Sequence, residues 1–107
     1  MKQSKYTIRL LQTAEEDIKE IITYIALDNP TAAETAAGKF EKSLSNLSIH
    51  PFIGKIPNEE DLAGMGYRFL IVQNYLIFYI IEDHIIWVHR IIHGARDYLS
   101  LLSPNSR

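Results

Sequence analysis

Residues 66–98, GYRFLIVQNYLIFYIIEDHIIWVHRIIHGARDY, are the densest apolar stretch in this chain of 107 residues. Two polar pairs, Gln73-Asn74 and Asp83-His84, divide the stretch into three runs of strand length. Short apolar runs joined by two-residue turns are typical of an antiparallel meander. The middle run, residues 75–81, is aromatic or aliphatic at every position, which predicts a central strand covered on both faces.

Two helices are predicted upstream of the meander, after a weakly alternating strand over residues 5–11. Thr13 followed by Glu16 is a capping-box pattern, so we expect the first helix to begin at Thr13 and to end at residues 27–29. Asn29-Pro30 then supplies a cap and a proline for the start of a second helix. The apolar positions of both helices recur at spacings of three and four residues: Ala14, Ile18, Ile21, Ile22 and Ile25, then Ala33, Ala36, Ala37, Phe40, Leu44 and Leu47.

Proline and glycine mark the rest of the chain as irregular. Residues 50–66, HPFIGKIPNEEDLAGMG, predict a long ordered loop, and Gly94 ends the third strand before a short helix over residues 95–102. The sequence therefore predicts one domain over residues 1–107 with an α+β fold in the order β-α-α-β-β-β plus a short C-terminal helix. A helical hairpin covers one face of an antiparallel sheet, and the other face stays partly open.

Composition limits the classes of protein. The chain has no cysteine, which excludes disulfides, thiolate zinc sites and cysteine nucleophiles and fits a reducing compartment. Its apolar runs are much shorter than the roughly 20 residues that span a bilayer, and its N-terminal apolar stretch is too short for a signal peptide. We therefore expect a cytoplasmic protein with no membrane partner. A formal net charge of −2 lacks the basic excess of most nucleic-acid-binding proteins.

Polar residues inside the meander need an explanation because most of its strand positions are apolar. If both turns contain two residues, one face of the sheet carries Arg68, Tyr79, Val88 and Arg90. The other face then carries Phe69, Phe78, Trp87, His89 and His93. A slip of one residue would change this partition.

Arg68 and Arg90 would be neighbours on that face and would repel one another unless carboxylates intervene. They indicate either internal pairs with Asp97 or Glu82, or an anionic partner. Arg68, Arg90 and Arg96 could also clamp phosphate for RNA cleavage, with a histidine or Tyr98 as acid or base.

A metal site is not expected. His89 and His93 have helical metal spacing, but residues four apart in a strand are too distant for easy chelation. Motifs for nucleotide binding, serine hydrolysis and zinc proteolysis are absent from the sequence. We expect no cofactor.

Several short motifs together resemble a known superfamily. They are A-E-E-D-I at residues 14–18, H-P-x-x-G at 50–54, G-Y-R at 66–68, N-Y-x-I-F-Y at 74–79 and R-I-I-H-G-A-R-D at 90–97. Their order is similar to that of the RelE/ParE superfamily, the toxins of type II toxin–antitoxin systems, also called plasmid stabilisation proteins. The resemblance covers nearly the whole chain.

The resemblance implies one of two functions. RelE-like members cut messenger RNA in the ribosome with strand cations and a C-terminal tyrosine or histidine, whereas ParE-like members inhibit DNA gyrase. The RelE-type strand cations would fall near Leu70 and Leu76, and Tyr98 lies one turn before the expected tyrosine. The resemblance therefore favours a ParE-like gyrase inhibitor that is not an enzyme. The alternative is a RelE-like mRNA endonuclease, and the third interpretation is a toxin-fold remnant kept as an antitoxin partner. Residues of the endonuclease alternative are Arg68, Arg96, His93 and Tyr98.

The resemblance also implies a cognate antitoxin, similar to ParD or RelB, in a toxin–antitoxin hetero-oligomer. An antitoxin segment would fold in an apolar groove of the helical hairpin and along an exposed sheet edge. The residues expected to bind partners are Arg68, Arg90, Arg96, Phe40, Ala33 and Ala37.

Overall fold

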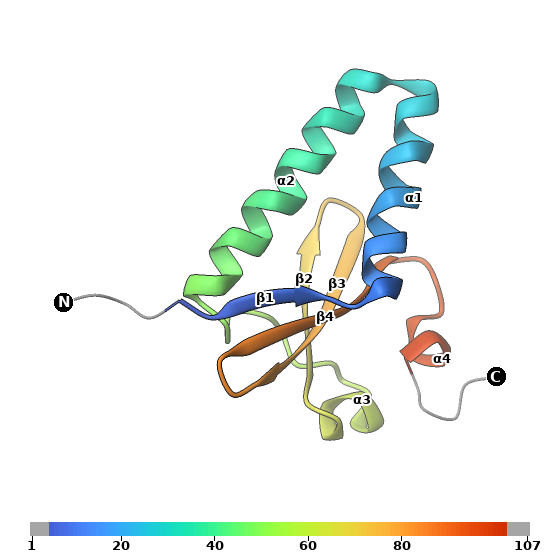
Figure 1. Cartoon of the computed structure of the whole chain (residues 1–107). Coiled ribbons are helices and arrows are strands. Elements are labelled where there is room, and N and C mark those ends of the chain that lie inside the picture. Colours follow the sequence, from blue (N-terminus) through green and yellow to red (C-terminus); the bar gives the residue numbers. More distant parts are fainter. Residues whose placement is uncertain (1–4, 103–107) are drawn as a thin grey trace.

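The computed structural model describes residues 5–102, and it has the predicted α+β order. Its elements are β1 (Thr7–Leu10), α1 (Gln12–Asp28), α2 (Pro30–Ile49), α3 (Glu60–Gly64), β2 (Tyr67–Val72), β3 (Tyr75–Glu82), β4 (Ile85–His93) and α4 (Tyr98–Leu102). The two long helices form a hairpin that rises from one side of the sheet (Figure 1). The three predicted strands of the meander, their two-residue turns and the helical hairpin are confirmed.

Four strands form one sheet in the order β1-β4-β3-β2. The meander β2-β3-β4 is antiparallel, as predicted, but β1 pairs with β4 in parallel. Both meander turns place their first residue at positive φ, Gln73 at 55° and Asp83 at 56°, which fits the turn type whose twist matches paired strands. The sheet is therefore an antiparallel meander extended by one parallel edge strand.

The capping box predicted for α1 is wrong. Leu11 is the cap, it donates its backbone N–H to Val88 O at 2.9 Å, and no side chain caps the helix. The pairing with β4 thus carries the chain directly from β1 into α1, and Thr13 already lies inside the helix. Its hydroxyl donates instead to His89 O at 3.0 Å.

The boundary between α1 and α2 is confirmed. Asn29 ends α1 and caps α2, where its side-chain oxygen accepts from Ala32 N at 3.1 Å. Pro30 occupies the first turn of α2, where a missing N–H costs nothing.

Two other boundaries differ from the prediction. The long loop contains the short helix α3, and Lys55 forms a β-bridge with Phe69 of β2. The last helix begins at Tyr98, not at residue 95, because Ala95 N–H donates to His93 Nδ1 and Arg96 N–H donates to His93 O. These bonds form a turn in place of the predicted first helical turn.

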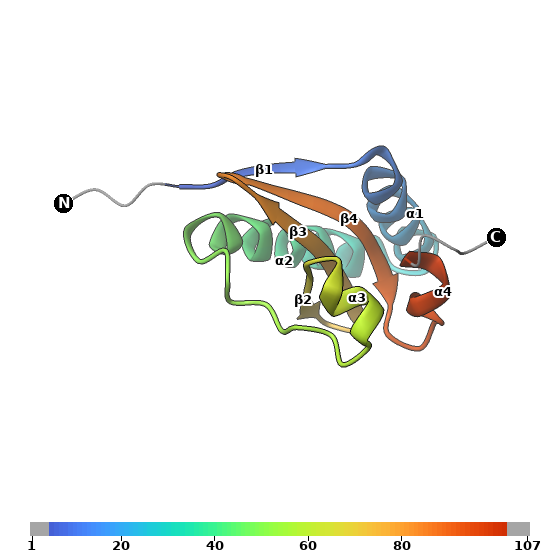
Figure 2. The same cartoon turned by 90° about the horizontal axis from the view of Figure 1, so that it is seen from below.

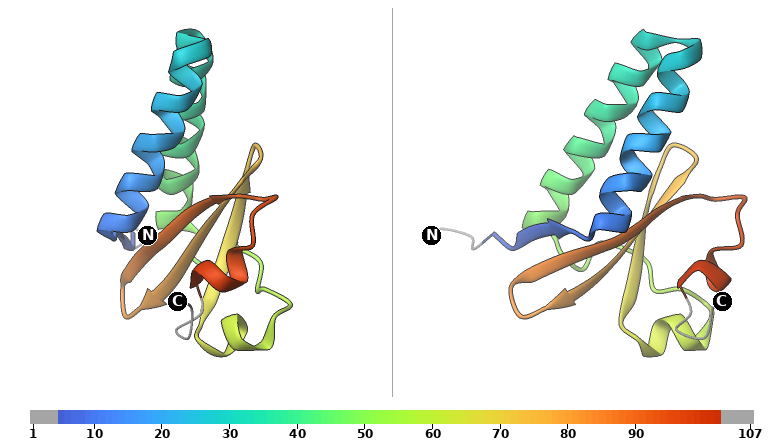
Figure 3. Two further views of the ribbon diagram at one scale, coloured as in Figure 1. Left: turned by 90° about the vertical axis from the view of Figure 1, so that its right-hand side faces the viewer. Right: turned by 45° about the vertical axis from the view of Figure 1, so that its right-hand side comes forward.

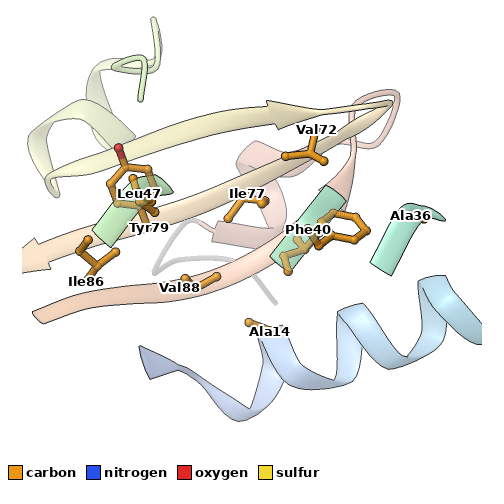
Figure 4. Packing of buried hydrophobic residues seen from close by; sticks show 10 residues of the cluster. Ala14, Ala36, Phe40, Leu47, Val72, Ile77, Tyr79, Ile86 and Val88 are labelled. Atoms are coloured by element: carbon orange, nitrogen blue, oxygen red, sulfur yellow. The ribbon is translucent and has the colours of Figure 1, made fainter. Parts of the chain in front are cut away.

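The main core lies between the helical hairpin and the sheet. Figure 4 shows residues from both helices and from β2, β3 and β4 pointing into it. We call this side of the sheet the hairpin face. Its buried residues are Ala14, Ala36, Phe40, Leu47, Val72, Ile77, Tyr79, Ile86, Val88 and Ile91.

The opposite face is covered only in part, as predicted. The short helices α3 and α4 lie toward one end of the sheet, whereas the turn between β3 and β4 projects away from them (Figures 1 and 2). Under these helices is a second cluster of Leu62, Tyr67, Phe78, Ile92 and Leu102. The views in Figure 3 show the long hairpin and the short helices on different sides of the sheet.

A β-bulge interrupts the pairing of β3 with β4. Tyr79 pairs with Val88, but Phe78 pairs with Arg90, so His89 is the extra residue. An uninterrupted register therefore predicts the wrong face of the sheet for each side chain of β4 beyond the bulge.

The predicted partition of polar residues is therefore wrong at two positions. Arg68 pairs with Tyr79 on the hairpin face, whereas Arg90 pairs with Phe78 on the opposite face. His93 pairs with Tyr75 and lies on the hairpin face, away from Phe78. Arg68 and Arg90 do not face one another, so the repulsion expected between them is absent.

Candidate functional site

Arg90 is bound within the fold by Asp17 of α1. Its Nε lies 2.8 Å and its Nη2 3.1 Å from the two carboxylate oxygens of Asp17. The same carboxylate accepts the backbone N–H of Ile91 at 2.9 Å. The hydrogen bonds that Arg90 donates to Asp17 raise the pKa of Arg90, which therefore stays charged at neutral pH. An internal pair was one of the two sequence-based interpretations, but the partner is Asp17, not Asp97 or Glu82.

Arg68 anchors the loop that follows α2. Its Nη1 donates to Gly54 O at 3.0 Å and to Phe52 O at 3.3 Å, and its guanidinium lies 5.2 Å from the centre of the Phe52 ring. Tyr79 holds the same loop, because its hydroxyl donates to Pro51 O and accepts from Gly54 N, each at 2.9 Å. Nη1 of Arg68, a donor that the sequence made available for phosphate, is thus directed at loop carbonyls.

The C-terminal corner contains the other predicted polar residues. His93 and Arg96 are exposed. Tyr98 packs on Phe78 with ring centres 5.2 Å apart, and its hydroxyl donates to Glu59 Oε2 at 2.9 Å. This hydrogen bond raises the pKa of Tyr98, which therefore stays protonated at neutral pH.

The structure does not bring the predicted ribonuclease residues together. Arg68 and His93 share the hairpin face, but their partners on β3, Tyr79 and Tyr75, are four residues apart, which is about 13 Å along a strand. Tyr98 packs on the opposite face, against Phe78. An acid, a base and a phosphate clamp must lie within hydrogen-bond reach of one substrate, and Arg68 lies too far from His93 and Tyr98 to act with them.

The hairpin residues expected to bind an antitoxin divide between core and surface. Phe40 and Ala33 are 2% and 4% exposed, so they pack inside the molecule. Ala37 is exposed on α2. Of these three residues, only Ala37 is accessible to a partner without a change in the fold.

Large apolar side chains are exposed elsewhere. Tyr24 and Leu27, at the tip of the hairpin, are 75% and 84% exposed. Three more lie on the loop that Arg68 and Tyr79 anchor: Phe52, Ile53 and Ile56. Exposed apolar groups at such a density are typical of protein interaction surfaces.

One pair of side chains on the opposite face was not predicted from the sequence. Tyr67, which is buried, places its hydroxyl 2.9 Å from His89 Nδ1, and the two rings are nearly perpendicular. Burial lowers the pKa of His89 against the weaker opposing effect of the Glu82 charge, and it raises the pKa of Tyr67. Both groups are therefore neutral at pH 7. The signal in the sequence was a histidine in a mostly apolar strand, but its partner depends on the bulge.

Within residues 5–102, no group of three histidine, cysteine or acidic residues could hold a metal ion. Over the same range, no helix is long and apolar enough to cross a membrane.

Comparison with known protein families decides the identity. The family described as "ParE toxin of type II toxin-antitoxin system, parDE" matches residues 8–98, which include both long helices, the whole β2-β3-β4 meander and all of β1 except Thr7. The chain belongs to the ParE toxin family. The resemblance to the RelE/ParE superfamily is thereby confirmed, and the chain is a toxin component of a type II toxin–antitoxin system.

Two solved structures share this ParE-family fold. One is the chromosomal ParDE system from P. aeruginosa, with 15% sequence identity, a TM-score of 0.69, and coverage of 84% of this chain and 97% of that chain. The other is the RelBE2 toxin–antitoxin complex from Mycobacterium tuberculosis, with 26% identity, a TM-score of 0.60, and coverage of 83% and 98%. A comparison with curated protein sequences produced no match.

Proposed function

We propose that this ParE-family toxin inhibits DNA gyrase and is neutralised by a cognate antitoxin. The observation that carries the proposal is the dispersal of the ribonuclease residues, because Arg68 binds loop carbonyls on one face while Tyr98 binds Glu59 on the other. Because Arg68 and Tyr98 lie on different faces, we favour action by binding a target over RNA cleavage. A gyrase target also places the toxin in the cytoplasm.

A RelE-like mRNA endonuclease is the second candidate. It is favoured by the 26% identity to a chain of the RelBE2 complex, which exceeds the identity to the ParDE structure. Arg96 and His93 are exposed and could contact RNA. This alternative requires Arg68 to leave the loop or to take no part in the reaction.

The two candidates predict different responses to expression of the toxin from a tightly controlled promoter. Gyrase inhibition should induce the DNA damage response and filamentation while transcripts stay intact, and purified toxin should block supercoiling by purified gyrase. An endonuclease should instead cut transcripts and arrest translation within minutes. Transcript ends, translation rate and a damage-response reporter should be measured in the same cultures.

Paired variants make this test specific. Arg68→Ala/Arg96→Ala removes the two cations that match the endonuclease pattern, and Lys39→Ala/Lys42→Ala removes two exposed cations of α2. If the toxin inhibits gyrase without these arginines, both pairs should remain toxic, provided that thermal unfolding shows them to be folded. Early transcript cuts that disappear only in the arginine pair would transfer the assignment to the endonuclease.

The antitoxin is proposed because the chain belongs to a family of type II toxins and both similar structures are of toxin–antitoxin systems. Co-expression of the small protein encoded next to the toxin should restore growth. Equal growth with and without that protein would contradict the proposed partnership.

A further inference from the structure

One row of side chains crosses all four strands on the face opposite the hairpin. Arg9 of β1 pairs with Trp87 of β4, Trp87 pairs with Ile80 of β3, and Ile80 pairs with Tyr67 of β2. Directly opposed residues of neighbouring strands share a face and lie about 5 Å apart. The row therefore runs from a guanidinium through an indole to an aliphatic side chain.

The short helices cover this row only at one end, where Tyr67 belongs to the second cluster and Ile80 packs against it. Tyr98 of α4 packs on Phe78, which lies two residues before Ile80 on β3, and α3 contributes Leu62 to the same cluster. Toward the β3–β4 turn, no helix of residues 5–102 lies over this face of the sheet (Figures 1 and 2). Trp87 and Ile80 are only half-buried, and Arg9 is exposed.

This uncovered part of the face contains a hollow of about 320 Å³, lined by Leu11, Ile80, Glu82, Trp87 and His89. Its floor is apolar, and His89 supplies a polar group whose position is fixed. Tyr67 holds the His89 ring through Nδ1, and Thr13 holds its backbone carbonyl. Within residues 5–102, Nε2 of His89 makes no hydrogen bond, so it remains available to a ligand.

The charges around the hollow favour a protein ligand over a nucleic acid. Arg9 flanks Trp87 on β1, and Glu82 lines the hollow on β3. In the part of the chain that the structure describes, neither forms a salt bridge. A phosphate backbone needs several cations, whereas the hollow and its rim offer one arginine, one carboxylate and a neutral imidazole, because Arg90 on the same face is bound by Asp17. A peptide with an apolar side chain between an acidic and a basic residue would fit this surface. Its acidic residue would meet Arg9, its basic residue would meet Glu82, and its apolar side chain would enter the hollow.

We propose that this surface, formed by Arg9, Trp87, Ile80, Glu82 and His89, binds a segment of the cognate antitoxin that places an aromatic or large aliphatic side chain over Trp87. The inference rests on the proposed antitoxin partnership. An antitoxin segment that is disordered alone and folds on the toxin can wrap such a shallow face. An acidic residue of the segment meets Arg9, and a basic residue meets Glu82.

Trp87 is the only tryptophan of the chain, so its fluorescence reports on this surface directly. The full-length toxin should be titrated with purified antitoxin whose tryptophans, if any, are replaced by phenylalanine. We expect the emission of Trp87 to shift to shorter wavelength and its quenching by acrylamide to fall at least twofold in the complex. Single-stranded RNA should cause neither change.

Charge variants test the same surface without disturbing its apolar floor. Arg9→Glu and Glu82→Lys should each weaken antitoxin binding at least fivefold, because both side chains are exposed and the variants reverse the complementary charges. Lys19→Glu and Glu34→Lys, at exposed positions of α1 and α2, should leave the affinity within twofold.

A complex that forms with unchanged Trp87 emission and quenching would overturn this inference while leaving the antitoxin partnership intact. A response to RNA in place of antitoxin would overturn it in favour of a nucleic-acid site. If the antitoxin does not bind the toxin at all, the proposed partnership fails together with this inference.

Discussion

Asp17 joins the first helix to the last strand through one carboxylate. It accepts two hydrogen bonds from the Arg90 guanidinium and one from the backbone N–H of Ile91. Thr13, one helical turn earlier, donates to His89 O. The edge of β4 that pairs with β1 is thus contacted further along by two side chains of α1, Thr13 and Asp17. These contacts lie at the bulge.

Loss of the Asp17 carboxylate should destabilise the fold. Asp17→Ala leaves the partly buried Arg90 guanidinium and the Ile91 N–H without their acceptor, and hydrogen bonds to charged groups contribute roughly 1.5–3 kcal/mol each. We expect the free energy of unfolding in urea to fall by about 2–3 kcal/mol. Arg90→Ala should cost less, because Ile91 keeps its acceptor.

Lys19→Ala, two residues further along the same helix, serves as the control because Lys19 is exposed. Its unfolding free energy should stay within about 0.5 kcal/mol of the wild type. If Asp17→Ala and Arg90→Ala unfold at the wild-type urea concentration, while Arg90→Ala loses antitoxin affinity, Arg90 binds the partner and the internal pair contributes nothing.

His89 should make stability depend on pH. Burial lowers its pKa in the folded protein below the ordinary value of 6.5. As pH falls through 6.5, the unfolded chain therefore binds a proton that the folded chain resists, and stability falls. The slope is limited to about 1.4 kcal/mol per pH unit for one proton, and we expect less because Glu82 partly offsets the burial.

Urea unfolding at pH 7.5 and 5.5 should show this loss in the wild type and a smaller loss in His89→Gln, whose amide can still bond Tyr67. His93→Gln is the matched control, because His93 is exposed at the far end of the same strand. Equal pH dependence of the wild type and His89→Gln would contradict the assignment of this loss to His89.

The sequence identified Arg90 and His89 as unusual strand residues, but it could not identify their partners. Asp17 is 73 residues from Arg90 in the sequence, and a local sequence pattern cannot predict a contact between residues so far apart. The two-residue turns predicted the register only as far as Val88, because the pattern of the strand does not show the extra residue at 89. Every face assignment beyond the bulge depended on that residue.

At the scale of elements, the loop after α2 depends on a close approach between Gly54 and Tyr79. A Cβ at position 54 would lie 2.3 Å from the Tyr79 hydroxyl oxygen and 2.9 Å from two of its ring carbons. Tyr79 has 0% exposure, so its ring has no free space in which to move. Gly54→Ala should therefore lower the unfolding free energy by about 3 kcal/mol, as overpacked sites do.

A double-mutant cycle tests this explanation. Tyr79→Phe leaves Gly54 N–H and Pro51 O without a partner, which costs about 1–3 kcal/mol, but it also removes the oxygen nearest to the new methyl group. The double variant should therefore be more stable than the sum of the single losses predicts. Gly38→Ala, where no atom lies within 4 Å, should instead stabilise α2 by up to about 1 kcal/mol. Strict additivity in the cycle would contradict the proposed clash.

The long elements were predictable because their signals are local. Apolar spacing gave both long helices, and Asn29-Pro30 gave the boundary between them. The short helix α3 has only five residues, too few for a periodic pattern. The cap of α1 was predicted at the wrong residue. Leu11 is held by the hydrogen bond from its backbone N–H to Val88 O, and a capping motif does not predict this contact between strands.

At the scale of the whole molecule, the chain combines neighbouring and distant pairings. The α1–α2 hairpin and the β2-β3-β4 meander join elements that follow one another in sequence. In contrast, β1 pairs with β4 across almost the whole chain, with Thr7 opposite Ile85. The sequence indicated a first strand but not its parallel partner, because neither its length nor its alternation specifies a neighbour.

This difference predicts the order of folding. Closing a long loop costs conformational entropy before any contact compensates for it, so nearby pairings should form first and the β1–β4 pairing late. Ile77 lies at the centre of β3 with 0% exposure, and Ile8 packs against the same core from β1. Ile77→Val should cost about 1 kcal/mol, and Ile8→Ala about 2 kcal/mol, because it removes more of a side chain that is only half-buried. The first should mainly slow folding and the second should mainly accelerate unfolding, as measured by stopped-flow chevron plots. If Ile8→Ala slows folding as strongly as Ile77→Val, β1 is already paired in the transition state and the distant pairing belongs to the folding nucleus.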